Sequence, residues 1–414
     1  MRIRFPQPEV TWTLCDQAIV SLGSFTVNLL LARSLEPAQY GLFSLILLAI
    51  LALSVITNSV LFYPMSVRAT VAVDEDRGEV FGGGLVLLLL GCIPLCVVTA
   101  LIMFVLGSSE LAPLVAIWFI LRQVQELVRR ALFAEMRHAA AVPGDALCYL
   151  GSAAVLLAIA QWRALSVEDA IIAMAATSGL AALAQAIQVG IRFGGASQIR
   201  RFALDWAVLG GGSLGSNLSS MLRGQVFPWT LAATGGVAAA ANFQAAWNLV
   251  QLTNPIVLGL CNVIPQTVAR GRAARNNEHA WHVARPLMLV GAIPIFVYYT
   301  LLCAIPGIVL AVLYGSESAY THLGLVVQAM TLSAAVAYPA DMVCAYLHGI
   351  EAVRLAMRIN LGGLVASVLI GVPLTLVFGI TGSCLALLAA SCVRTALAYQ
   401  VLNGALAHDR RRYA

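Results

Sequence analysis

The chain contains repeated apolar stretches that are long enough to cross a lipid bilayer, separated by short polar breaks. A bilayer core about 30 Å thick takes roughly 20 apolar residues in helical form. Of the 414 residues, 60% are hydrophobic and only 10% are charged, which is too little charge to cover a soluble domain. The stretches lack the polar and apolar alternation of membrane β-strands, so helices must satisfy the backbone in lipid. The sequence therefore predicts an all-α polytopic membrane protein.

We expect about twelve transmembrane helices. The shortest break is the last one, where Gly379 and Gly382 allow a tight turn. Residues 1–10 are short and basic, and a segment long enough to span follows them, so no cleavable signal peptide is expected. The expected spans are 11–33, 39–66, 80–106, 111–135, 142–161, 168–190, 205–231, 236–266, 283–313, 322–348, 355–378 and 380–402.

The arginines orient these spans. All 24 basic residues are arginine, and basic residues accumulate in cytoplasmic loops. Most of them fall in alternate loops and at both ends of the chain, which predicts that both termini are cytoplasmic in a multi-pass protein of a bacterial inner membrane. The loops on the opposite side are too short for a catalytic domain. The arginines on the cytoplasmic side are Arg2, Arg4, Arg68, Arg77, Arg129, Arg130, Arg137, Arg192, Arg200, Arg201, Arg270, Arg272, Arg275, Arg285, Arg354, Arg358, Arg410, Arg411 and Arg412.

A shift of 201 residues lays the second half of the chain on the first, which predicts a repeat. Helix lengths and loop sides match under the shift, Asp16 falls on Asn217, and Pro64 falls on Pro265. We expect a lobe of six helices over 1–190, a cytoplasmic loop over 191–204 and a second six-helix lobe over 205–414. Six is an even number, so the repeat is parallel. Transporters built in this way hold their substrate between the lobes and rock them to alternate access.

Four short stretches resemble one family. Leu31 to Ser44 (LARSLEPAQYGLFS) is similar to the junction between the first two helices of polysaccharide flippases, and Tyr63-Pro64-Met65-Ser66 is similar to their Tyr-Pro turn. The stretches 129–137 and 379–386 resemble the exit of helix four and the start of helix twelve. These flippases are the Wzx-type O-antigen and exopolysaccharide translocases of the MATE-like multidrug/oligosaccharidyl-lipid/polysaccharide exporter superfamily. The junction in the second half, 231–236, has lost the Tyr-Gly signature.

The resemblance implies a flippase in polysaccharide biosynthesis, with a MATE-like fold. Its cargo would be a polyprenyl-pyrophosphate-linked oligosaccharide, moved from the cytoplasmic to the periplasmic leaflet. The partners to expect are this lipid-linked oligosaccharide, membrane lipids, a polysaccharide polymerase and the chain-length machinery. No nucleic-acid partner is expected, because the positive charge is spread among loops.

Ionisable residues inside spans mark functional sites, because burying a charge in a bilayer is costly. Arg122 and Glu126 are four residues apart, so they either form an ion pair within one helix or leave Arg122 to bind substrate phosphate. Arg223 has no acidic residue three or four positions away, and we expect it in the substrate cavity. Asp16 is a candidate for coupling to a cation, or else reaches the cytoplasmic interface.

Other polar groups extend these candidates. Glu126 and Asp341 are further possible coupling residues, and for Arg394 we expect its side chain to reach the interface. Gln244, Asn248, Gln251 and Asn254 form a polar stripe on the eighth expected helix. Such a stripe either bonds neighbouring helices or lines a wet route. The expected substrate-binding residues are Arg122, Arg223, Asn28, Asn217, Gln225, Gln244, Asn248 and Gln251.

Three functions are possible for a membrane protein of this kind. A flippase ranks first, and a multidrug or small-cation antiporter of the same superfamily is the alternative, although an arginine-bearing cavity disfavours a cationic cargo. A membrane glycosyltransferase, ligase or polymerase would present a large outer loop, so we expect no enzyme and no catalytic residue. The nine cysteines lie mostly in apolar stretches and the histidines are scattered, so neither a metal site nor a cofactor is expected.

Overall fold

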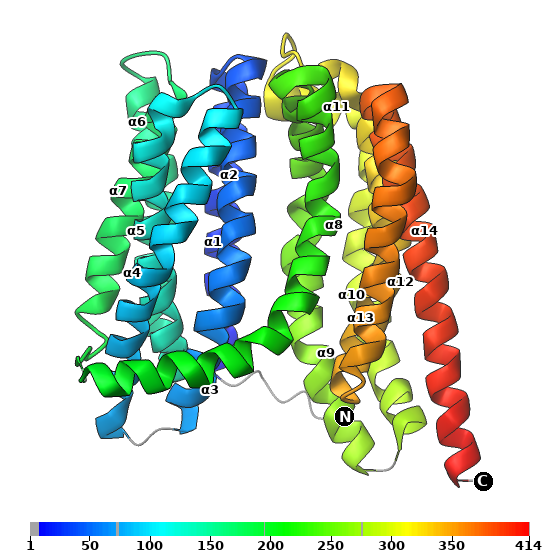
Figure 1. Ribbon diagram of the computed structural model, residues 1–414. Coiled ribbons are helices and arrows are strands. Elements are labelled where there is room, and N and C mark those ends of the chain that lie inside the picture. Colours follow the sequence, from blue (N-terminus) through cyan, green and yellow to red (C-terminus); the bar gives the residue numbers. More distant parts are fainter. Residues whose placement is uncertain (1–7, 72–73, 194, 275, 414) are drawn as a thin grey trace. The chain divides into compact units, whose positions relative to one another are not determined.

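The computed structural model describes residues 8–71, 74–193, 195–274 and 276–413 (Figure 1). Every regular element in these residues is a helix. The chain divides into two units, Met1–Met221 and Leu222–Ala414, and each is described by itself. Of the arginines used for topology, Arg2, Arg4 and Arg275 lie outside the described residues.

Unit 1 is a bundle of apolar helices. Helix α1 packs along α6, and α7 packs against both α5 and α6. Gly23 lets α1 approach α6 closely, because a Cβ atom there would lie 2.7 Å from the backbone of Tyr149. The elements of this unit are α1 (Pro8–Ser34), α2 (Pro37–Thr57), η1 (Asn58–Phe62), α3 (Tyr63–Val71), α4 (Asp74–Val105), η2 (Ser109–Leu111), α5 (Ala112–Ala134), α6 (His138–Ala160), α7 (Val167–Ala186) and the first part of α8 (Ala196–Val250).

Unit 2 begins within α8, and the only regular elements in its described residues are again helices. Helix α12 packs along α9 and α14, and α9 packs along α10. Its elements after α8 are η3 (Gln251–Thr253), α9 (Asn254–Ala274), α10 (Asn277–Ala304), α11 (Pro306–Tyr314), η4 (Thr321–Leu323), α12 (Gly324–Gly349), α13 (Val353–Ala366), η5 (Ser367–Gly371) and α14 (Val372–Tyr413).

Ten helices in the described part of the chain are long and apolar enough to cross a membrane. They do not match the twelve expected spans one to one. Expected span 205–231 is helical within α8 but is not among the ten, because its serines, glycines, Asn217 and Arg223 make it too polar. Expected spans 355–378 and 380–402 fall together in one stretch, Val353–Ala407. The number twelve and the cytoplasmic termini stay predictions.

Two glycines turn the chain within long helical stretches. Gly379 has φ 57° and ψ −133°, and Gly236 has φ 74° and ψ 174°, so neither is helical. Around Gly379 the two segments run antiparallel, because Gly371 packs beside Ala386 while Gly362 packs beside Leu397. The tight turn expected at 379–382 is therefore present, and the break expected between spans 205–231 and 236–266 falls at Gly236.

One expected span is corrected. The stretch 283–313 was expected to be a single helix, but α10 ends at Ala304 and α11 starts at Pro306. Ile305 between them has φ −134° and ψ 48°. Proline lacks an amide hydrogen and disfavours the helical conformation of the residue before it, which explains the break at this position.

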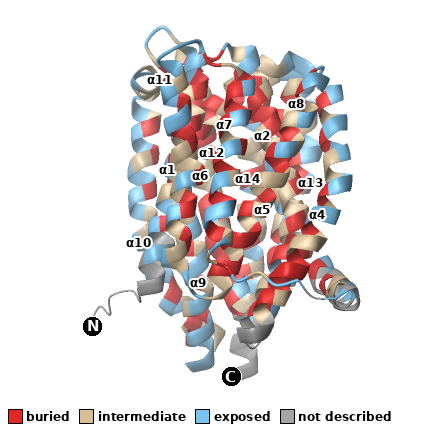
Figure 2. Ribbon diagram, turned by 90° about the vertical axis from the view of Figure 1, so that its left-hand side faces the viewer, coloured by how far each residue is buried: buried red, intermediate tan, exposed pale blue. Residues whose placement is uncertain are grey.

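Burial follows the helix faces within each unit (Figure 2). The buried side chains are mainly apolar and aromatic, with Tyr40, Phe43, Phe62 and Phe119 fully inaccessible in unit 1. Many large apolar side chains are exposed on the outer faces of the helices, as expected of surfaces covered by lipid. The buried polar residues are therefore exceptions, and they mark the candidate sites.

Replacing Gly379 with alanine should destabilise unit 2, because its dihedral angles lie in a region that only glycine adopts readily. We expect a loss of about 1–3 kcal/mol in unfolding free energy. The measurement is denaturant unfolding of the purified protein in detergent. Gly259→Ala is the matched control, since Gly259 lies inside α9 with open space around its Cα and has no positive φ. Equal stability of the two variants would contradict the assignment.

Candidate coupling and substrate sites

Unit 1 contains a buried ionic cluster centred on Arg129 of α5. Its Nη2 donates to Asp16 Oδ2 at 2.5 Å, and its Nε donates to Asp145 Oδ2 at 2.5 Å. Asp16 comes from α1 and Asp145 from α6, and both carboxylates are completely inaccessible to solvent. A single guanidinium thus joins three helices. This arrangement gives both carboxylates a cationic partner, which lowers the cost of burying them, and only Asp16 Oδ1 of their described oxygens has no hydrogen-bond partner.

Two amide side chains complete the cluster around Asp145. Gln125 Nε2 donates to Asp145 Oδ1 at 2.8 Å, and Gln185 Nε2 donates to the same oxygen at 3.1 Å. Gln185 also donates to the backbone oxygen of Ala141 at 2.9 Å. Both glutamines are fully buried. The second carboxylate of the cluster is therefore held by donors from α5 and α7 as well as by Arg129.

Arg122 and Glu126 do not form the ion pair that was considered from the sequence. Glu126 accepts from Arg130 Nε at 2.6 Å and from Arg129 Nη1 at 3.4 Å. Arg122 donates to the hydroxyl of Tyr149 and to Cys148 Sγ at 3.4 Å, and its guanidinium lies over the Tyr149 ring at 4.7 Å. The direct partners of Arg122 are thus neutral.

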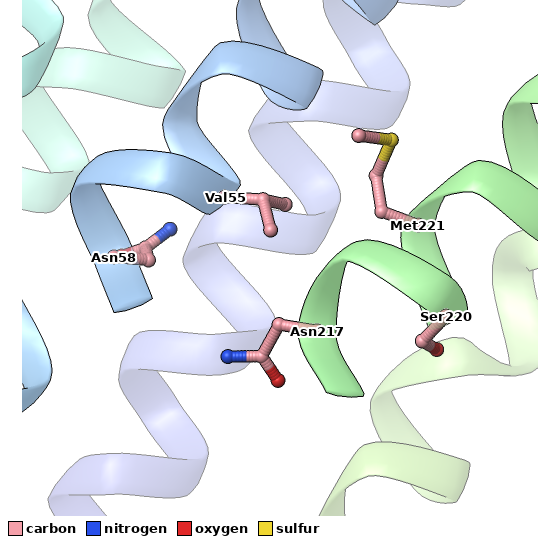
Figure 3. A pocket seen from close by; sticks show the side chains of 5 residues that line it. All are labelled: Val55, Asn58, Asn217, Ser220 and Met221. Carbon is pink, nitrogen blue, oxygen red and sulfur yellow. The ribbon is translucent and has the colours of Figure 1, made fainter. Parts of the chain in front are cut away.

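A cavity of about 330 Å³ lies in unit 1 where α2 and η1 face α8 (Figure 3). Asn217, an expected substrate residue, lines it and donates from Nδ2 to Ser59 Oγ at 3.0 Å. Asn58 also lines it, and its buried Oδ1 has no hydrogen-bond partner. It belongs to η1, a π-helical turn, and such turns occur frequently at functional sites. The remaining lining residues are Val55, Ser220 and Met221.

Unit 2 holds a second ionic cluster. Arg394 of α14 donates from Nη2 to Asp341 Oδ1 at 2.6 Å and from Nε to Asn360 Oδ1 at 3.2 Å. The expectation that Arg394 reaches the interface is wrong, because this residue is only 3% exposed. Arg223 of α8 lies beside Arg394, and its buried Nε has no hydrogen-bond partner. Arg223 and Asp341, two sequence candidates, are thus brought together.

The other polar candidates of unit 2 are more scattered. Gln225 accepts from Trp229 Nε1 at 3.2 Å within its own helix. Gln244 Nε2 donates to Asn248 Oδ1 at 2.8 Å, so these two do form a pair along α8. The expected stripe is not continuous, because α8 ends at Val250 and Gln251 lies in the short turn η3.

Asn28 of unit 1 forms its hydrogen bond within its own helix, α1. Its Nδ2 donates to the backbone oxygen of Ser24 at 3.0 Å, and its buried Oδ1 has no partner. Among the described residues, no group of three metal-ligating side chains is found. The expectation that no metal is bound stays a prediction.

Four residues of the cluster around Arg129 in unit 1 were not recognised as site residues from the sequence. Asp145 had a detectable signal, since it is an isolated carboxylate within an apolar span. Arg129 was counted only among the arginines on the cytoplasmic side, at the exit of expected span 111–135, and it lies within α5, more than a turn before the helix ends. Gln125 and Gln185 give no comparable signal, because neutral polar residues occur in several spans.

Comparison with known proteins addresses the fold. No family model matches the chain, and no curated protein matches it significantly. The inward-facing structure of a multidrug resistance MATE family transporter of the MOP superfamily superposes with a TM-score of 0.73 at 16% identity, covering 97% of this chain and 94% of that one. The fold is that of the MATE transporters.

Two further structures with the MATE fold agree. The outward-facing conformation of a MATE family transporter matches with a TM-score of 0.65 at 15% identity, covering 94% of this chain and 93% of that one. A MOP superfamily transporter from Pyrococcus furiosus, whose binding pocket is described as having reverse polarity, matches with a TM-score of 0.65 at 14% identity, covering 95% and 94%. The expected MATE-like transporter fold is confirmed. At these identities the similarity concerns the fold and does not extend to cargo.

Proposed function

We propose that the chain is a flippase that carries a polyprenyl-pyrophosphate-linked oligosaccharide across the bacterial inner membrane by alternating access. The charge of Arg223 carries this proposal. No described carboxylate forms an ion pair with it, and its Nε is buried without a partner. A buried cation without a matching carboxylate is costly in a membrane, and an anionic cargo would supply the missing charge.

Neutral polar groups support a sugar as the second part of the cargo. The cavity in unit 1 presents the amide of Asn58, the amide of Asn217 and the hydroxyl of Ser220, beside the apolar Val55 and Met221. Amides and hydroxyls donate to and accept from the hydroxyl groups of a sugar, and apolar side chains pack on its C–H faces. We infer that oligosaccharide passes over these residues.

The multidrug or cation antiporter remains the second candidate, because the fold is shared with multidrug resistance transporters. A cationic cargo needs a carboxylate that can bind it. In the described ion pairs of unit 1, Asp16 and Asp145 are engaged by Arg129, and Glu126 by Arg130. A MOP superfamily transporter with reversed pocket polarity, described as suggesting a different function, also supports the idea that polarity differs among proteins of this fold.

The proposed function is tested by translocation in proteoliposomes. A fluorescently labelled polyprenyl-pyrophosphate oligosaccharide is placed in the outer leaflet, and its loss of accessibility to an added glycosidase is followed with time. We expect faster loss than in protein-free vesicles. A lipophilic cation dye, offered to parallel vesicles under an ion gradient, is the comparison. Accumulation of the dye without movement of the oligosaccharide would favour the antiporter.

Replacing Asp16 with asparagine tests whether this carboxylate couples transport to an ion. Because Asp16 is bonded to Arg129 in a closed cluster, neutralising it removes the charge that a coupling ion would exchange with. We expect translocation by Asp16→Asn to lose its dependence on a proton or sodium gradient. Rates are measured with each gradient imposed and collapsed. An unchanged gradient dependence in Asp16→Asn would remove Asp16 from the coupling mechanism.

A further inference from the structure

The ionic cluster of unit 2 contains two arginines and one carboxylate. Arg394 uses Nη2 for Asp341 and Nε for Asn360, but its buried Nη1 has no hydrogen-bond partner. Arg223 likewise has a buried Nε without a partner. Each unpaired N–H group of a buried guanidinium carries a desolvation penalty. The described residues of the cluster thus leave donors for a further acceptor.

The two arginines lie side by side over Gly363 of α13. A Cβ atom at Gly363 would lie 3.2 Å from Arg223 Cδ and 3.3 Å from Arg394 Cδ. A side chain at this position would require both arginine side chains to shift by a few tenths of an ångström. They are also close enough to interact electrostatically with each other and with Asp341. Two like charges held together in this way favour an anion that contacts both.

Asp341 differs from its partner in exposure. The side chain of Asp341 is 31% exposed, whereas that of Arg394 is 4% exposed. Asp341 is thus the less enclosed partner of the pair, and Arg394 is also held by its bond to Asn360 of α13. A carboxylate and a phosphate offer the guanidinium fork the same kind of acceptor oxygens. Asp341 occupies the position that a phosphate oxygen would take.

We propose that Arg223 and Arg394 form a binding site for a phosphate-type oxyanion, and that Asp341 is a resident counter-ion which the ligand displaces from Arg394. The inference rests on the proposed function in one respect: the pyrophosphate of the lipid-linked cargo is the expected ligand. A phospholipid headgroup offers the same chemistry, and the experiment separates the two sources. Asn360 positions Arg394, and Gly363 lets the side chains of both arginines approach α13 closely.

The test is calorimetric titration of inorganic pyrophosphate into the full-length protein in phosphatidylcholine nanodiscs. We expect Arg223→Gln and Arg394→Gln each to weaken binding by about ten- to a hundredfold, because charge-assisted hydrogen bonds are lost. Asp341→Asn keeps the shape of the side chain but removes the competing charge, so binding should tighten by roughly tenfold. Arg163→Gln is the matched control, since Arg163 is an exposed arginine of unit 1 paired with Asp169.

Folding of each variant is monitored in parallel by size-exclusion chromatography. Arg223→Gln leaves the Arg394–Asp341 pair intact, so this variant still tests the anion site if the other two misfold. Binding that is unchanged in Arg223→Gln, or weakened rather than tightened in folded Asp341→Asn, would overturn the proposal. Repeating the titration in nanodiscs with phosphatidylglycerol identifies the source. Competition by this lipid assigns the site to headgroups, and its absence assigns the site to the cargo.

The outcome is separate from that of the translocation assay. If pyrophosphate does not bind but the oligosaccharide still crosses the membrane, the anion site is wrong and the flippase stands. If pyrophosphate binds in the expected order of variants but no oligosaccharide crosses, the site stands and the flippase assignment fails.

Discussion

Replacing Arg223 with alanine is expected to abolish oligosaccharide translocation while leaving folded protein in the membrane. The arginine has no carboxylate ion pair among the described residues, so its removal breaks no salt bridge and relieves an unpaired buried Nε. Structural stability should therefore be unchanged or slightly raised. Translocation, in contrast, should stop, because the substitution removes the guanidinium that we propose binds the anionic part of the cargo. The measurement is the proteoliposome translocation rate at equal protein density.

The control for this prediction is Arg163→Ala, which also removes one arginine but affects an exposed residue whose side chain bonds Asp169. It should translocate at the rate of the unmodified protein. Normal translocation by Arg223→Ala would show that the charge of Arg223 serves neither cargo binding nor the transport cycle. Arg223 would then no longer be assigned to cargo binding.

Replacing Asp145 with asparagine is expected to cost about 1–3 kcal/mol of unfolding free energy, because the buried Nε of Arg129 loses its charged acceptor while Asp16 and Glu126 still pair with the guanidinium. The substitution also turns an amide N–H₂ toward a donor, either Arg129 Nε or the glutamines that bond the other oxygen. The measurement is denaturant unfolding in detergent. Glu351→Gln is the control, because Glu351 is 87% exposed and its pair with Arg272 should contribute less than about 1 kcal/mol.

A double-variant cycle sharpens this prediction. Arg129→Gln combined with Asp145→Asn removes both charges, so the combined loss should be smaller than the sum of the two single losses. Additive losses would show that the two residues contribute independently, and the cluster would then be an incidental contact.

The sequence supported the broad architecture well and the sites only in part. Hydropathy predicted helices throughout, and glycine at position 379 predicted a tight turn that the dihedral angles confirm. The resemblance predicted a MATE-like fold, which the structural comparisons confirm. These features could be predicted because each depends on local composition or on a short stretch of the chain.

The partners of the charged residues could not be predicted, because they come from distant parts of the chain. Arg129 and Asp16 are 113 residues apart, and Arg394 and Asp341 are 53 residues apart. Helical spacing left open an ion pair between Arg122 and Glu126, four positions away, beside a role of Arg122 in binding the substrate. In the structure Glu126 pairs with Arg130, which is also four positions away from it. Arg122 instead donates a hydrogen bond to Tyr149 on α6. Spacing alone cannot choose between such neighbours.

The use of arginine at both positions of the unit 2 site has a consequence for the release of cargo. A guanidinium stays protonated at every pH that a cell experiences, whereas a buried lysine can lose its proton. The two arginines of the proposed site therefore cannot release an anion by losing their own protons. We expect release of the bound anion to depend on a conformational change that moves the two arginines apart, or on the return of Asp341 to Arg394. In the second case Asp341, a carboxylate of the same chain, would compete with the cargo phosphate for Arg394 and so promote release of the cargo.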